Sequence, residues 1–148
     1  MKKIKSTGII FGDMHFPLHD EAAFSCALKV IEKVKPSVFI NLGDFAEGEM
    51  VSHWRWSRRR RPPLEYQLPL IDKEADEVNF HMDRIDKVLD KVGCKKKYLA
   101  MGNHDAWYNQ FVEENPYLEQ YKPETLFKIK ERGYKWYPYG ELFKVEGS

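Results

Sequence analysis

The sequence predicts an α/β fold, in which helices flank a β-sheet, and three observations lead to that prediction. Apolar runs at residues 6–11, 38–42 and 97–101 each end in a glycine that polar residues follow. Such short runs are typical of buried strands in a parallel sheet. The first two runs enclose a segment whose apolar residues recur at spacings of three and four, the period of a helix with one buried face. Strand, helix and strand in this order indicate an α/β domain.

Residues 20–34 are the predicted first helix. Asp20 is the expected N-cap, and Pro36 closes the segment. A helix between two strands implies that the strands are parallel and joined by a right-handed crossover. Ligands of open α/β sheets collect beyond the carboxyl ends of the strands, and Asp13 and Asp44 both follow such ends.

The middle of the chain departs from this alternation. Residues 48–67 hold two tryptophans, a run of four arginines and two prolines, and we expect an irregular segment there. A long helix is predicted from Leu70 to Val92, because apolar residues recur at helical spacing until Gly93 stops them. We interpret residues 48–93 as an insertion, with a Trp/Arg loop and a long helix, in a single domain of residues 1–148.

The last third of the chain predicts short elements. Helices are expected around residues 106–114 and 124–132. Residues 134–137 and 141–145 are predicted as strands with a turn between them, which together resemble a hairpin cut short.

Composition narrows the class of protein without naming a partner. The 148 residues suit one domain, and 24 basic residues against 23 acidic ones leave a net charge that favours no particular ligand. Two cysteines do not make a disulfide framework. The Lys-rich start precedes an apolar run too short for a signal peptide or a membrane span, so we expect a cytoplasmic protein without membrane contact.

Three turns carry the residues that indicate chemistry. They read Gly-Asp-Met-His at residues 12–15, Gly-Asp at 43–44 and Gly-Asn-His-Asp at 102–105, and each follows a predicted strand. Any one of them alone is more often an ordinary turn. Together they offer carboxylates, an amide oxygen and imidazoles, ligands that suit Mn²⁺, Fe²⁺ or Zn²⁺. Two such cations roughly 3.5–4 Å apart can clamp a phosphoryl group, and Asp44 could bridge them.

The order Asp-x-His, Gly-Asp, Gly-Asn-His-Asp resembles the calcineurin-like metallophosphoesterase superfamily. The resemblance implies a metal-dependent phosphoesterase with two divalent metal ions, most simply Mn²⁺, with Fe²⁺ and Zn²⁺ as alternatives. Position by position, Asp13 and His15 would bind the first metal, Asp44 both metals and Asn103 the second. His104 would be the general acid that protonates the leaving oxygen.

The resemblance extends to residues around these motifs. Glu47 occupies the position of a carboxylate that orients the catalytic histidine in the phosphatase branch, so it would orient His104. Asp105 would support the turn or the metal ligands. The phosphatase branch has an arginine directly after the orienting carboxylate, and here that position is Gly48. A phosphate-binding cation would then come from Arg55 or from the run that begins at Arg58.

The resemblance also implies a sandwich of two mixed sheets flanked by helices, of which the chain would hold the first sheet and an incomplete second one. The family normally supplies further histidines downstream of Gly-Asn-His, but none of the five histidines here lies after residue 104. We expect a chain truncated at its C-terminus. The alternatives are a homodimer that completes the site in trans and a catalytically degenerate binding or scaffold protein.

Tryptophans and arginines interleave in residues 54–61, a mixture that can stack on bases and hold phosphates. The segment favours a nuclease or phosphodiesterase acting on nucleic acid, with Arg55, Arg58 and His53 as substrate contacts. A solvated loop with the tryptophans packed beneath it is the ordinary alternative. A small-nucleotide phosphohydrolase is the rival enzyme. His81, on the long helix, is expected at the surface or its boundary.

Overall fold

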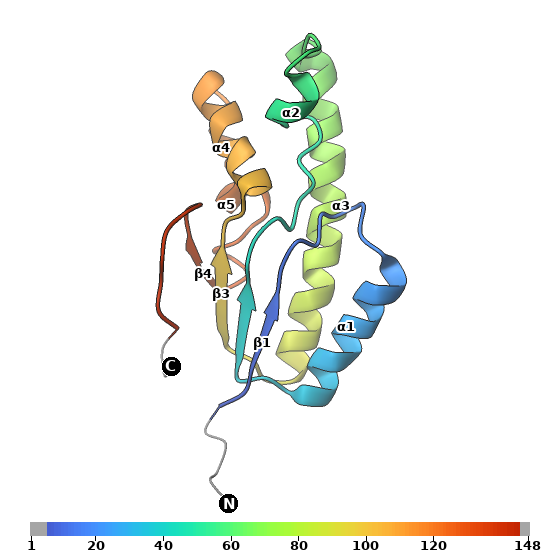
Figure 1. Ribbon diagram of the computed structural model, residues 1–148, viewed down its shortest axis with the longest axis vertical. Helices are drawn as coiled ribbons and strands as arrows, with labels where there is room; N and C mark the ends of the chain where they lie inside the picture. The colour runs from blue at the N-terminus through green and yellow to red at the C-terminus, as the bar shows by residue number, and fades with distance from the viewer. Residues whose placement is uncertain (1–5, 146–148) are drawn as a thin grey trace, which may run out of the picture.

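The chain folds around a parallel sheet of four strands, and the computed structural model describes it within residues 6–145 (Figure 1). The strands are β1 Gly8–Phe11, β2 Val38–Asn41, β3 Lys96–Ala100 and β4 Tyr134–Tyr137, in that order across the sheet. Each of the three strand pairs is parallel, although the resemblance implies a mixed sheet. The predicted α/β fold is confirmed, and β4 extends this same sheet beside β3.

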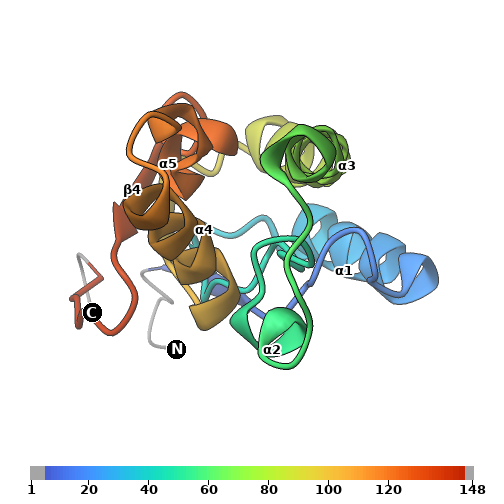
Figure 2. The same ribbon diagram turned by 90° about the horizontal axis from the view of Figure 1, so that it is seen from above.

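Helices α1 Glu21–Val34 and α3 Leu64–Lys91 pack against each other over the sheet (Figure 2). The Asp20 carboxylate accepts a hydrogen bond from the N–H of Ala23 at 2.9 Å, so the predicted N-cap is confirmed. Helix α3 begins six residues before its predicted start, because Pro69 lies within the helix and does not end it. Among residues 6–145, no helix has the length and apolar content that crossing a bilayer requires.

The apolar face of α3 forms the centre of the core. Val78, Met82, Ile85 and Leu89 recur at the predicted helical spacing, and each of them is 0% exposed. They belong to one apolar cluster with buried side chains of α1, β2, β3, α4 and β4. The apolar face of α3 therefore lies inside the core that it shares with the sheet.

The shorter elements differ in part from their predictions. The irregular segment contains one helical turn, α2 His53–Trp56, and α4 Asn103–Glu114 begins three residues early, inside the third motif. A 3₁₀ turn, η1 Glu119–Tyr121, precedes α5 Pro123–Leu126. The predicted helix over 124–132 is wrong beyond Leu126, where consecutive turns lead into β4.

The predicted strand at residues 141–145 is also wrong. This segment has no strand pairing, and the ring of Phe143 stacks on Tyr137 at 4.2 Å and on Tyr98 at 6.0 Å between ring centroids. The aromatic contacts place the segment against β3 and β4, although it is not itself a strand. The expected hairpin therefore does not form within the described residues.

Burial of the strands is uneven. Strand β2 is central and mostly buried, as predicted, but β1 lies at the edge of the sheet. Ile10 in β1 is 60% exposed and Leu42 just after β2 is 54% exposed, so the prediction of a buried first strand is wrong for its outer face. Helices α1 and α3 lie together on one side of the sheet (Figure 2).

Truncation of the α3 core should be costly to stability. Ile85→Ala removes a fully buried side chain, and we expect it to lower the free energy of unfolding by about 2–5 kcal/mol. Lys87→Ala, at an exposed position of the same helix, should change it by no more than about 0.5 kcal/mol. Urea unfolding followed by circular dichroism measures both. Equal losses in the two variants would contradict the assignment of the core to this face.

Candidate metal centre

The three sequence motifs meet at the carboxyl ends of β1, β2 and β3 (Figure 1). The chain leaves each strand there through a turn, at residues 12–15, 43–44 and 102–105. Because the strands are adjacent and parallel, their turns lie side by side at one edge of the sheet.

The turns after β2 and β3 are in backbone contact, and two glycines allow it. A Cβ at Gly43 would lie 2.1 Å from the Gly102 nitrogen, and a Cβ at Gly102 would lie 2.1 Å from Asp44 Oδ1. Gly43 also has a φ of +87°, which L side chains rarely adopt. Any larger residue would force the two turns apart.

A buried carboxylate bridges the same turns. Asp105 is 0% exposed, and its Oδ2 accepts hydrogen bonds from Asp44 N at 2.7 Å and Gly102 N at 2.9 Å. At the third position of α4, it also caps the N-terminus of that helix. Burial raises the pKa of Asp105 to about 7, and the nearby Asp44 carboxylate adds to the rise, against the lowering effect of the two N–H donors.

Backbone strain concentrates at the motifs. Asp13, His15 and Asp44 have φ values of 52°, 47° and 48°, in the left-handed region that non-glycine residues seldom occupy. Backbone bonds hold them there, since the N–H of Asp13 donates to Gly43 O at 3.2 Å and that of His15 to Asp44 O at 2.8 Å. Such outliers cluster at functional sites, where the surrounding structure maintains them.

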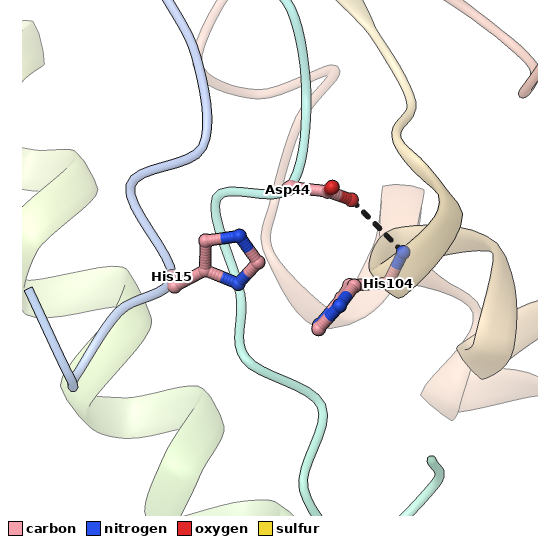
Figure 3. Close-up of side chains that lie close together, drawn as sticks. All are labelled: His15, Asp44 and His104. Carbon is pink, nitrogen blue, oxygen red and sulfur yellow. Dashed lines mark hydrogen bonds between the residues drawn. The ribbon is translucent and has the colours of Figure 1, made fainter. Parts of the chain in front are cut away.

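Three of the motif side chains converge. His15, Asp44 and His104 each offer a ligand atom, and these atoms all lie within 4.8 Å of one another (Figure 3). The two imidazole rings meet edge to face at 4.5 Å between centroids. The N–H of His104 donates to Asp44 Oδ1 at 2.9 Å, which fixes the carboxylate relative to α4.

Glu47 contacts both histidines, though not as the resemblance implies. Its carboxylate Oε2 lies 2.9 Å from His15 Nδ1 and 4.0 Å from His104 Nδ1. The close partner of His104 Nδ1 is instead the backbone carbonyl of Glu47, at 2.7 Å. A carbonyl oxygen can only accept, so this Nδ1 carries a hydrogen and Nε2 is the nitrogen that gains or loses a proton. The same reasoning leaves His15 Nε2 free to bind a cation.

The remaining predicted residues lie at the rim. Asp13 and Asn103 are exposed, and Asp13 is not one of the side chains that converge within 4.8 Å. Arg55 pairs with Glu49, and His53 and Arg58 are exposed on and after α2. The structure thus brings His15, Asp44, Glu47, His104 and Asp105 together and leaves the expected substrate contacts further out.

Two residues that support this site were not among the predicted ones. Glu74 in α3 accepts hydrogen bonds from Gly48 N at 2.6 Å and from the Tyr108 hydroxyl at 2.7 Å. It therefore ties the loop that carries Glu47 to the helix that carries His104. Tyr108 could have been found as the residue one turn after His104, but Glu74 lies 26 residues from Gly48 with no local signal.

The donor set fits a divalent transition metal. The His15 imidazole, oriented by a carboxylate, and the buried Asp44 carboxylate are ligands that Mn²⁺, Fe²⁺ and Zn²⁺ accept, and the His104 imidazole lies beside them. Asp13 and Asn103 follow the ends of β1 and β3 and offer further oxygen atoms. A cluster of such donors at the strand ends of an α/β sheet marks a candidate metal centre.

Comparison with known families agrees with the site. The family model of calcineurin-like phosphoesterases matches residues 9–147, so the chain belongs to this family of metal-dependent phosphoesterases. The predicted resemblance is therefore confirmed. No curated protein and no solved structure matches the chain.

The Glu74 clamp leads to a stability prediction. Burial raises the pKa of Glu74 above its usual value of 4.5, so the folded chain holds this proton more tightly than the unfolded chain. The free energy of unfolding of the wild type, relative to Glu74→Gln, should therefore fall as pH rises from 4.5 through the raised pKa. Glu74→Ala should lose about 1–3 kcal/mol for each buried donor left without an acceptor.

Urea unfolding between pH 4 and pH 8, a range of roughly four units chosen around the carboxyl pKa values, measures this effect. Glu65→Gln, an exposed change on the same helix, controls for the loss of one carboxylate. The prediction would be contradicted if the free energy of unfolding of the wild type, relative to that of Glu74→Gln, rose with pH.

Proposed function

We propose that the chain hydrolyses phosphoester bonds with two divalent cations, most simply Mn²⁺, held by Asp13, His15, Asp44 and Asn103. The convergence of His15, Asp44 and His104 within 4.8 Å, in a member of the calcineurin-like phosphoesterases, carries the proposal. Bound there, the cations would neutralise phosphate charge and act as Lewis acids. The nitrogen and oxygen donors favour Mn²⁺, Fe²⁺ or Zn²⁺ over Mg²⁺.

His104 is the proposed general acid. Its Nδ1 is held by the Glu47 carbonyl, and its ring packs against Trp107 at 4.0 Å between centroids. These contacts fix the imidazole and leave Nε2 as the atom that would give a proton to the leaving oxygen. Glu47 would act on both histidines, through its carbonyl on His104 and through its carboxylate on His15.

A phosphodiester in single-stranded nucleic acid is the proposed substrate. Trp54 is 78% exposed and Tyr66 is 66% exposed, on either side of the exposed arginines 58–60. Aromatic faces beside cations suit stacked bases and their phosphates. Trp56, by contrast, is half-buried and donates its indole N–H to Met50 O at 3.2 Å, so only part of the segment is available to a ligand.

Measurements of activity and of metal content should distinguish the general acid, His104, from the metal ligands. With Mn²⁺ and bis(4-nitrophenyl) phosphate, His104→Asn should lower kcat by about 10²–10⁴-fold, because proton transfer to the leaving group is lost. Metal content, measured by elemental analysis, should stay at the wild-type level in that variant and fall in Asp44→Asn. Gln110→Ala, exposed on the same helix α4, is the control for both measurements. Loss of metal in His104→Asn would reassign His104 as a ligand, and no hydrolysis by the wild type would sink the proposed activity.

The substrate proposal has its own test. Replacing Arg58, Arg59 and Arg60 together by Gln should weaken binding of a single-stranded oligonucleotide and reduce the slope of log Kd against log salt by about 2. Hydrolysis of the small diester should be unchanged. The matched control replaces three exposed lysines of the helical face, Lys29, Lys33 and Lys87. Fluorescence anisotropy at several salt concentrations gives the slopes. Equal slopes in the two triple variants would favour a small nucleotide as substrate.

A further inference from the structure

A second group of metal-ligand side chains lies away from the candidate metal centre. His19 directly precedes the N-cap of α1, Glu21 is the first residue of α1, and His81 lies in the middle of α3. One ligand atom from each residue lies within 4.8 Å of the other two. None of the three belongs to the motifs that define the family resemblance, so the proposed hydrolysis does not account for them.

The three side chains are held close to coordinating positions. His19 Nε2 lies 3.0 Å from Glu21 Oε2, near the roughly 3.3 Å that separates two ligands on a tetrahedral zinc ion with bonds of about 2.0 Å. The rings of His19 and His81 meet at 4.2 Å between centroids. His81 in turn stacks on the buried ring of Phe16 at 4.8 Å, which limits its freedom to turn away.

His19 has an unsatisfied nitrogen. Its side chain is only 9% exposed, and its Nδ1 has no hydrogen-bond partner among the described residues. Buried polar atoms in native proteins are nearly always paired, and this unpaired nitrogen is not the one beside Glu21, which is Nε2.

The guanidinium of Arg84 lies where a metal ion would contact Glu21 and His81. Arg84 donates to both carboxylate oxygens of Glu21, at 2.6 and 2.8 Å, and lies 3.1 Å from His81 Nδ1. The cluster thus already attracts positive charge. Glu21 is 57% exposed and Arg84 is 26% exposed, so a metal ion would compete with a two-bond ion pair for this carboxylate.

We infer that His19, Glu21 and His81 form a second metal site, which takes a divalent transition ion of the zinc type. Two imidazoles and one carboxylate match the ligand chemistry of Zn²⁺, with water completing the tetrahedron. Such an ion would fasten the loop after His15 to the middle of α3. Its role would be to hold the loop of the first motif, and it does not depend on the proposed hydrolysis.

The test removes the candidate metal centre first. In a chain carrying His15→Asn and Asp44→Asn, we expect one Zn²⁺ per chain by calorimetry and one Co²⁺ with the strong visible absorption of tetrahedral coordination. Adding His19→Asn or His81→Asn should weaken this binding by more than the roughly 10–100-fold that changes outside the coordination sphere cause. His53→Asn, a histidine change outside the cluster, is the matched control and should leave the binding as it is.

A variant that is expected to bind Zn²⁺ more tightly adds a test whose result a folding defect would not explain. Arg84→Gln in the same background removes the competing guanidinium and should tighten Zn²⁺ binding by up to about fivefold, the equilibrium equivalent of an exposed ion pair. The inference is overturned if the background binds no metal. It is equally overturned if both histidine variants, shown to be folded by circular dichroism, bind Zn²⁺ as tightly as the background does. Because the background lacks two proposed ligands of the candidate metal centre, neither result bears on the proposed hydrolysis.

Discussion

Asp105 accepts hydrogen bonds from the backbone N–H groups of Asp44 and Gly102, and this buried carboxylate holds the turns of two neighbouring strands in contact. The contact leaves no room for a side chain at Gly43 or Gly102. Asp44 lies beside this contact, and its carboxylate accepts a hydrogen bond from the N-terminus of α4. The same helix carries His104, so the distance between carboxylate and imidazole is set by the joined turns and not by the side chains alone.

Hydrogen bonds connect the joined turns to groups that are distant in sequence. His104 Nδ1 donates to the carbonyl of Glu47, whose carboxylate reaches His15 in the turn after β1. The next N–H along the chain, that of Gly48, donates to Glu74 on α3. Helix α3 thereby supports the site from outside the motifs, while its apolar face fills the core. One helix both buries the sheet and fixes the loop of Glu47, so core packing and site geometry are coupled.

The fold and the position of the site were accessible from the sequence because their signals are local. Apolar runs ending in Gly-Asp or Gly-Asn marked the strands, and Asp20 marked the start of α1. The predictions that were wrong concern features that tertiary contacts decide. Phe143 stacks on Tyr137 where a strand was expected, and β1 lies at an edge that its apolar sequence does not reveal. The Glu74 contact escaped for the same reason, since no spacing rule connects a helix to a loop 26 residues away.

The charges of the site explain why a cation belongs there. The carboxylates of Asp44 and Glu47 lie beside the joined turns, and that of Asp44 contributes to the raised pKa of Asp105, about 7, which leaves Asp105 only partly charged at neutral pH. Arg55, the cation expected from the sequence, is paired with Glu49 and leaves this excess of negative charge in place. In a site of low dielectric such charges repel unless positive charge is supplied between them. The hydrogen bonds that bring these side chains together therefore also bring negative charges close to one another. Divalent cations bound at Asp44 and His15 would neutralise those charges.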